Sequence, residues 1–189
     1  MEQSSSEFVC RMHLSKYLGS NPEVTIPEGV EVIDPRAFQG KELIKTVTFP
    51  ASVKTTGWSA FMECKNLETA DLSRCENIWS LNNNLFQGCE SLTRVILPKQ
   101  LKYQVTIHGQ CFLGCSSLQT LILPAGIVKI DRSAFEDCTS LTHIELPDGI
   151  SEVDQCVFHG CSSLESIDLP DSLQRGARIV LLCRSKVLP

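Results

Sequence analysis

The sequence lacks the features by which several large functional classes are recognised. It has no apolar run of 18 residues, so no segment is expected to cross a bilayer as a helix. It contains no glycine-rich phosphate-binding loop and no serine elbow, which are common signatures of nucleotide binding and of hydrolysis. Basic residues are in the minority, and the formal net charge of −5 argues against nucleic acid as a partner. The composition of the 189 residues, 42% hydrophobic and 21% charged, fits one globular domain.

The N-terminal segment also lacks the pattern of a secretory signal peptide. Glu2 stands where a basic segment is expected, and Arg11 and Lys16 interrupt the apolar positions. We therefore expect a cytoplasmic protein without membrane insertion, with the cell surface as the alternative location.

What the sequence does contain is a phenylalanine that returns at nearly regular intervals. Intervals of 23, 25, 26, 23 and 23 residues separate Phe38, Phe61, Phe86, Phe112, Phe135 and Phe158. The segments that begin at the last three are alike: FLGCSSLQTLILP (112–124), FEDCTSLTHIELP (135–147) and FHGCSSLESIDLP (158–170). A fixed period of about 20–50 residues indicates a solenoid, because each unit must stack on copies of itself to bury its apolar face.

The positions that flank the phenylalanine predict a short helical turn. Four residues before it stand Asp34, Gly57, Asn82, His108, Asp131 and Asp154, and all but His108 suit or tolerate a helix N-cap. Two residues after it stand Gly40, Glu63, Gly88, Gly114, Asp137 and Gly160, where glycine suits the left-handed turn that ends a helix. We therefore expect each phenylalanine to lie in one helical turn that is capped at both ends.

A second pattern, L-x-x-L-x-L followed by proline, predicts a β-strand in each repeat. The first apolar position holds Ile44, Leu67, Leu92, Leu118, Leu141 and Leu164. The next two apolar residues alternate with other residues, as Leu121 and Leu123 do, and so point to the same side. Proline is tolerated after them, as at Pro124, because a strand end needs no ladder donor.

The combined pattern, as in residues 118–138, resembles the BspA-like class of leucine-rich repeats. The resemblance implies an α/β fold, namely a right-handed leucine-rich repeat solenoid with a parallel β-sheet on the concave face and short helical turns opposite. We place the solenoid at residues 23–170 and a divergent basic C-terminal repeat or tail at 171–189. Members of this class include surface proteins implicated in adhesion, and such repeats bind protein partners through the strand-lined face. No catalytic residue belongs to the motif, so we expect neither an enzyme nor a cofactor.

Residues 1–22 are predicted to form an N-terminal helical cap on the first repeat. Ser4 and Glu7 have the spacing of a capping box, and Gly19 suits the end of a helix. The apolar residues that share one side of this helix are Phe8, Met12, Tyr17 and Leu18. A cap is needed because the open end of a stacked array otherwise exposes core residues to water.

Ten cysteines raise the question of disulfides or metal. One repeat position, three residues after the phenylalanine, holds Cys64, Cys89, Cys115, Cys138 and Cys161, and we expect buried free thiols there that pack as small apolar groups. His108, Cys111 and Cys115 have the spacing nearest to a zinc set, but Cys115 belongs to the inward position, so no metal site is expected. Neighbouring Cys–His pairs such as Cys156 and His159 lack the orienting third group that nucleophilic catalysis needs.

The predicted binding surface lies on the outward-facing strand positions. The residues eight positions after the phenylalanine are Thr46, Thr69, Arg94, Thr120, His143 and Ser166, and those ten after it are Thr48, Asp71, Ile96, Ile122, Glu145 and Asp168. Most are polar, but Ile96 and Ile122 occur in neighbouring repeats and are predicted to form one apolar patch. Its charged surroundings are Asp71, Glu145 and Asp168, with Arg94 and His143 on the same surface. This anatomy favours a partner with basic residues around an apolar side chain, although isoleucine also simply suits strands.

Two connections between strand and phenylalanine are longer than the usual eleven residues, with thirteen before Phe86 and fourteen before Phe112. They carry Trp79 and Tyr103, which form either a rim that contacts the partner or neutral surface loops. The sequence as a whole thus indicates a non-catalytic protein–protein interaction module that binds its partner through the concave sheet face. The alternative is a cell-surface adhesion or antigen module.

The C-terminal residues 171–189 break the repeat. They carry a charge of +3, which leaves −8 on residues 1–170. Leu181 stands where a phenylalanine is expected, and Gly176 stands where an isoleucine is expected. Three accounts stay open: a degenerate closing repeat, an edge that self-associates through the C-terminal end, or the truncated end of a longer array.

Overall fold

The computed structural model describes residues 12–170 and 178–179, and within these residues it contains β-strands and no helix. Odd-numbered strands form one sheet, which we call the back sheet. Its strands are β1 (His13–Leu14), β3 (Val32–Ile33), β5 (Thr55–Thr56), β7 (Ser80–Leu81), β9 (Gln100–Ile107), β11 (Ala125–Ile130), β13 (Glu152–Val153) and β15 (Arg178–Ile179). Even-numbered strands form the front sheet. They are β2 (Glu23–Thr25), β4 (Thr46–Thr48), β6 (Thr69–Asp71), β8 (Arg94–Ile96), β10 (Thr120–Ile122), β12 (His143–Glu145) and β14 (Ser166–Asp168).

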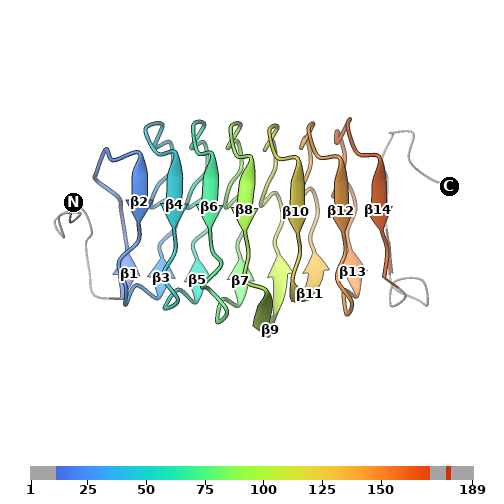
Figure 1. The fold of residues 1–189 in the computed structure, drawn as a ribbon, viewed down its shortest axis with the longest axis horizontal. Coiled ribbons are helices and arrows are strands. Elements are labelled where there is room, and N and C mark those ends of the chain that lie inside the picture. The colour runs from blue at the N-terminus through green and yellow to red at the C-terminus, as the bar shows by residue number, and fades with distance from the viewer. Residues whose placement is uncertain (1–11, 171–177, 180–189) are drawn as a thin grey trace.

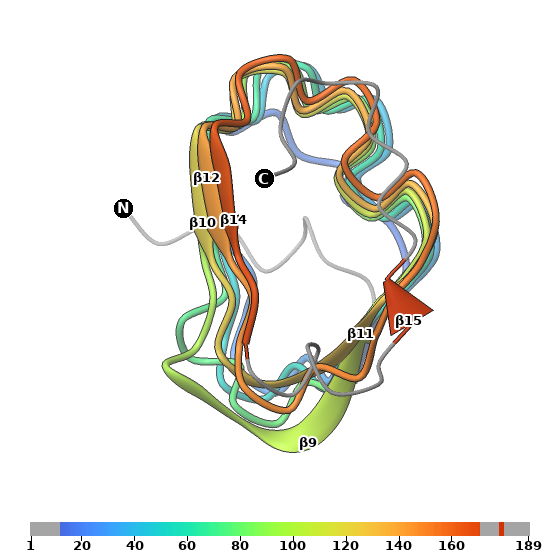
Figure 2. The same cartoon turned by 90° about the vertical axis from the view of Figure 1, so that its right-hand side faces the viewer.

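The strands of each sheet are parallel, and neighbours come from successive repeats. Val47 is in register with Ala70, for example, and Ile144 with Ile167. Figures 1 and 2 show that the repeats stack in an almost straight column, with the front sheet on one side and the back sheet across the core. The parallel β-solenoid predicted from the sequence is therefore confirmed, although the front sheet is nearly flat along the column.

The phenylalanines form the spine of the core, as their regular spacing predicts. All of them are at most 1% exposed, and each ring stacks on the next with centroids 4.4–5.7 Å apart. The leucine position beside them is also buried from Ile44 to Leu164. One aromatic side chain per repeat thus fills the space between the two sheets.

The predicted helical turn around each phenylalanine is wrong. The residue two positions before the ring has a positive φ of 55–60° in every repeat, and these residues are Arg36, Ser59, Asn84, Gln110, Ser133 and Cys156. The position two after the ring is left-handed too, with Gly40 at φ 67°. Left-handed residues on both sides of the ring are incompatible with an α-helix. The segment instead forms successive tight turns, and its peptide groups bond to the next repeat, as in Phe38 N–H to Ala60 C=O at 2.8 Å.

The predicted N-terminal helical cap is wrong for residues 12–22, while residues 1–11 lie outside the described chain. His13 and Leu14 form β1, which pairs with β3, so this segment is already a repeat. Tyr17 occupies the place of the phenylalanine, with its ring 5.0 Å from that of Phe38. Burial of Leu14 and Tyr17 in the first turn of the stack favours the extended chain over a helix.

The C-terminal region that breaks the sequence repeat lies mostly outside the described residues. Its described part, β15, pairs in parallel with β13, with Arg178 opposite Glu152 and Ile179 opposite Val153. The backbone at 178–179 therefore continues the back sheet by one strand.

Candidate interaction surface

The outward positions of the front sheet lie where the alternation predicts. In each strand the central residue is inward and the two flanking residues face outward, as in β10, where Leu121 is buried and Thr120 and Ile122 are exposed. Ile122 is the most exposed of the large apolar side chains in the described residues, at 82%. An aliphatic side chain this exposed gains little from burial within the chain, so it is the main candidate for contact with another molecule.

The front sheet is interrupted between β8 and β10. Its strands fall into two hydrogen-bonded groups, β2-β4-β6-β8 and β10-β12-β14, and no residue of β8 pairs with β10. Figure 1 shows the wider interval between these two strands. A groove of about 360 Å³ lies here, and its lining residues are Thr93, Arg94, Val95, Ile96, Leu97, Pro98, Lys99, Thr120, Ile122 and Pro124. Ile96 and Ile122 therefore line one groove, as the predicted apolar patch requires.

The long connection after β8 accompanies this interruption. β9 has three extra residues where it pairs with β11, because Gln100 is opposite Ala125 but Val105 is opposite Ile127. Figure 2 shows β9 protruding beyond the outline of the other repeats. Gly126 lets the bulge of β9 lie close against β11. Its φ is +104°, and a Cβ added there would lie 2.8 Å from the Leu101 Cβ. The extra residues of β9 thus form a β-bulge that packs against the neighbouring strand.

The structure divides the predicted site residues between two sheets. Ile96 and Ile122 belong to the front sheet, whereas Trp79 directly precedes β7 and Tyr103 lies in β9, both in the back sheet. Trp79 is 49% exposed and Tyr103 is 52% exposed, so both are free to contact other molecules. Neither residue lines the groove of the front sheet.

The acidic residues flank the groove rather than line it. Asp71 is in register with Ile96, and Glu145 with Ile122, with Asp168 one strand further. Asp71 accepts a hydrogen bond from the Ser73 N–H at 2.9 Å, which directs its carboxylate to its own strand end. The predicted acidic surroundings are therefore present, but the ionisable groups in the groove itself are cationic.

His143 belongs to the same surface but faces away from the groove. Its Nδ1 lies 2.8 Å from the Ser166 Oγ, and its Nε2 lies 3.6 Å from the Asp168 Oδ2. Both partners come from β14, so the ring extends along the sheet toward the C-terminal end. The groove and His143 are thus neighbouring parts of one face rather than one cluster.

The cysteines at the regular repeat position have a role that the sequence did not reveal. Each thiol donates a hydrogen bond to the phenylalanine carbonyl of the preceding repeat, at 3.0–3.2 Å. Burial raises the pKa of the Cys64 thiol to about 12, which keeps it protonated and able to donate. The recurrence of cysteine where alanine or valine would pack equally well is the sequence signal for this role.

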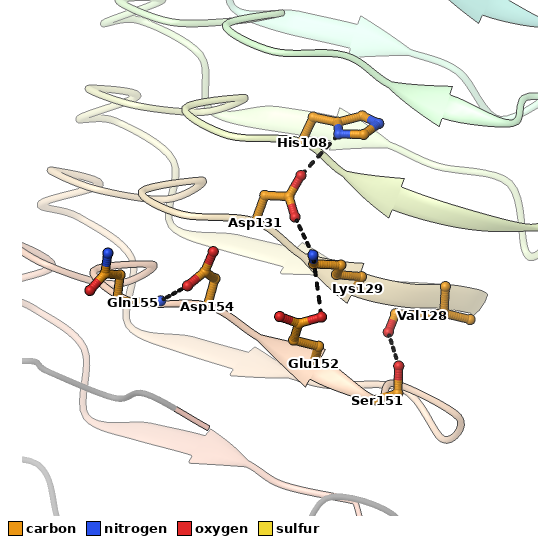
Figure 3. Close-up of polar contacts among 8 residues, drawn as sticks. All are labelled: His108, Val128, Lys129, Asp131, Ser151, Glu152, Asp154 and Gln155. Atoms are coloured by element: carbon orange, nitrogen blue, oxygen red, sulfur yellow. Dashed lines mark hydrogen bonds and ion pairs between the residues drawn. The ribbon is translucent and has the colours of Figure 1, made fainter. Parts of the chain in front are cut away.

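His108 takes part in a polar chain that joins neighbouring repeats (Figure 3). Its Nδ1 lies 2.9 Å from the Asp131 Oδ2, and the Asp131 Oδ1 lies 3.2 Å from the Lys129 Nζ. Lys129 also contacts the Glu152 Oε2 at 3.2 Å. Its hydrogen bonds to Asp131 and Glu152 raise the pKa of Lys129. These contacts connect three successive repeats along the edge of the back sheet.

The cysteines near His108 face elsewhere. Cys115 donates to the Phe86 carbonyl, and Cys111 is fully buried. Across residues 12–170 and 178–179 no three histidine, cysteine or acidic side chains gather in a way that would hold a metal ion. The described part of the chain also contains no helix long and apolar enough to cross a membrane.

A stack of parallel two-sheet repeats with a groove on one sheet defines a solenoid of the leucine-rich repeat class. The sequence profile of the BspA type leucine rich repeat region matches residues 16–105 and 80–179 in six copies. The chain therefore belongs to this family. Among proteins of curated function, none matches the chain.

Solved structures of bacterial leucine-rich repeat proteins are similar to the chain. A protein from Bacteroides ovatus is 28% identical with a TM-score of 0.71, over 90% of this chain and 45% of its own. One from T. pallidum is 24% identical with a TM-score of 0.61, over 90% of this chain and 72% of its own. A leucine rich cell surface protein from Faecalibacterium prausnitzii is 27% identical with a TM-score of 0.57, over 82% of this chain and 34% of its own. Two of these three relatives are thus more than twice as long as the part that matches.

Proposed function

We propose that the chain is a non-catalytic protein-interaction module that binds its partner through the front sheet, over the groove between β8 and β10. The observation that carries the proposal is the exposed Ile122 beside an interruption in an otherwise continuous sheet. An apolar centre with charged residues around it is the usual anatomy of a protein-binding patch.

Burial of the thiols also supports a non-catalytic function. A nucleophilic cysteine needs a lowered pKa, yet burial raises the pKa of both Cys64 and Cys75 to about 12. The repeats of this family are generally non-enzymatic. Binding through a surface is the function that this architecture performs without further chemistry.

The test is a double substitution, Ile96→Glu with Ile122→Glu, in the full chain. Both side chains reach the surface of the groove, so we expect the thermal unfolding midpoint to change little. Two carboxylates in an apolar contact are costly to desolvate, so the principal partner captured from a lysate of the source organism should be lost. Quantitative mass spectrometry of the captured proteins gives the result.

A matched control places the same charges elsewhere on the front sheet. Thr46→Glu with Thr48→Glu changes the two outward positions of β4, two strands before the groove. This control should retain the partner at wild-type yield. Equal capture by the folded Ile96→Glu/Ile122→Glu variant would contradict the proposal.

The cell surface is the second candidate setting, and the similarity to the F. prausnitzii cell surface protein favours it. We propose the cytoplasm as the first, because the described cysteines are free and buried thiols of this kind persist in reducing compartments. Biotinylation of intact cells of the source organism with an impermeant reagent distinguishes the two. Labelling of the chain supports the adhesion module, and labelling only after lysis supports the cytoplasmic one.

A further inference from the structure

The facing peptide groups of β8 and β10 lack the strand pairing that joins the other neighbouring strands of the front sheet. The Leu72 N–H donates to the Ile96 C=O at 2.8 Å, and the Leu146 N–H donates to the Asp168 C=O at 3.1 Å. The equivalent bond from Leu97 to Ile122 is absent, as is every other strand pairing between β8 and β10 in the described chain. The facing backbone N–H and C=O groups of β8 and β10 are therefore not paired with each other, and a polypeptide that lies over the groove is a ligand that offers them partners.

The ionisable side chains that line the groove are Arg94 and Lys99, and both are cationic and exposed. Neither forms an ion pair or a ring contact within the described residues. Other cations of the chain do: Lys45 with Glu68, Lys54 with Glu31, Lys102 with Glu76, Arg74 with Glu28 and Arg36 with the Trp58 ring. On a chain with a net charge of −5, two unpaired cations in one groove mark a place for anionic groups.

Their positions indicate where those anionic groups lie. Arg94 begins β8, and Lys99 lies in the bend after β8, so the two cations stand at the two ends of the groove-lining segment 94–99. Ile96 and Ile122 lie between them, beside the inward Val95 and Leu121. A segment that runs along the groove therefore meets a cation, an apolar centre and a second cation in that order.

We infer that the groove binds an extended segment of another protein that has a branched aliphatic residue at its centre and an acidic residue near each end. The inference rests on the proposed function, because it names the partner of the same surface. It replaces the basic partner that the flanking acidic residues alone would favour, since Asp71, Glu145 and Asp168 lie outside the groove. Those carboxylates instead confine the acidic ends of the segment to Arg94 and Lys99, because they repel an anion placed elsewhere on the sheet.

The test uses an array of immobilised pentapeptides and the purified full chain. The central residue is varied through all amino acids, and both terminal residues are glutamate, lysine or serine, with threonine between. We expect the glutamate peptides with central isoleucine, leucine or valine to bind at least tenfold more tightly than the same peptides with lysine ends. Amide signals of residues 93–99 and 120–124 should shift in the NMR spectrum when the best free peptide is added.

Charge reversal supplies the decisive variant. Arg94→Glu with Lys99→Glu changes two exposed side chains, so the fold should persist, and the array preference should invert from glutamate to lysine ends. The control Lys45→Glu reverses an exposed charge that directly precedes β4 and lies outside the groove, and it should leave the preference unchanged. A wild-type preference for lysine ends would overturn this inference while the front sheet remained the binding surface. NMR shifts that the peptide causes only at residues outside 93–99 and 120–124 would overturn the inference too. In that case the proposed function is decided separately, by whether the Ile96→Glu/Ile122→Glu variant still captures the principal partner.

Discussion

Each repeat is centred on one fully buried aromatic ring, and Phe135 is the best example. It lies 5.1 Å from the Phe112 ring and 5.7 Å from the Phe158 ring, and it is 0% exposed. Its neighbours in the stack belong to the preceding and following repeats. A change at this residue therefore acts on the contact between repeats as well as within one.

Phe135→Ala should lower the free energy of unfolding by about 3–5 kcal/mol, because it removes a large buried side chain and leaves a cavity. Since repeats contact mainly their neighbours, protection from hydrogen exchange should fall first in the C-terminal half. Hydrogen exchange of the variant measures this. A uniform loss of protection from residue 12 to residue 170 would contradict the nearest-neighbour account.

The buried thiols give the chain a pH dependence at the alkaline end. Burial raises the pKa of Cys64 and Cys75 from 9.0 to about 12, and it raises the pKa of Cys89, Cys111 and Cys115 as well. The folded chain keeps these protons after the unfolded chain has released them. Their contribution to stability is therefore complete below pH 9 and is lost as the pH rises toward 12.

Denaturant unfolding between pH 9 and pH 10.5 should therefore show a steep fall in the free energy of unfolding. Cys111→Ala removes one such thiol, so its slope should be smaller by about 1.4 kcal/mol per pH unit. Lysine and tyrosine residues also titrate in this pH range, but both proteins contain them. The difference between the two slopes therefore measures the contribution of the Cys111 thiol. Parallel slopes for the two proteins would show that the buried thiols do not cause the dependence.

Among the elements, the bulged strand β9 sets this chain apart from a uniform solenoid. It takes up the extra residues after Pro98 and places Tyr103 on an outward bulge, and its approach to β11 depends on Gly126. The interruption of the front sheet lies at the strands that directly precede β9 and β11. We infer that the bulge and the groove form together, because the same connection joins them.

Gly126→Ala tests this dependence, and Gly149→Ala is its matched control. Both glycines have a positive φ, +104° at Gly126 and +89° at Gly149. A Cβ added at Gly126 would meet the Leu101 Cβ, whereas a Cβ added at Gly149 would have no atom within 4 Å. Gly126→Ala should therefore cost about 1–3 kcal/mol more than the control. Thermal unfolding of the two variants gives the comparison. Equal losses of stability would mean that β9 shifts to make room for the added Cβ at no cost.

The sequence predicts the elements of this fold well where one residue type recurs at a fixed position. The phenylalanine and leucine positions are buried and the strand pattern is confirmed, because burial and alternation are local properties of the repeat. The helical turn is wrong because aspartate and glycine near Phe38 suit a helix cap and a tight turn equally, and only the left-handed Arg36 decides between them. Tyr17 was missed because its spacing to the next ring differs and it lies in a segment that reads as helical.

At the scale of the whole molecule, the candidate site was predicted only in part. The outward position of Ile96 and Ile122 follows from strand alternation in adjacent repeats. The groove between them does not, because it depends on how the fourteen-residue connection before Phe112 displaces one strand from another. Trp79 and Tyr103 were expected at the same surface, but the connections place them on the other sheet.

The most direct test of the proposed binding surface is hydrogen exchange of the full chain with and without its captured partner. The account predicts new protection at residues 93–99 and 120–124, where free strand edges and the two isoleucines meet the partner. The phenylalanine turns and β9 should exchange as in the free chain. Protection at the turns or at Trp79 and Tyr103, with no change in β8 and β10, would contradict the account.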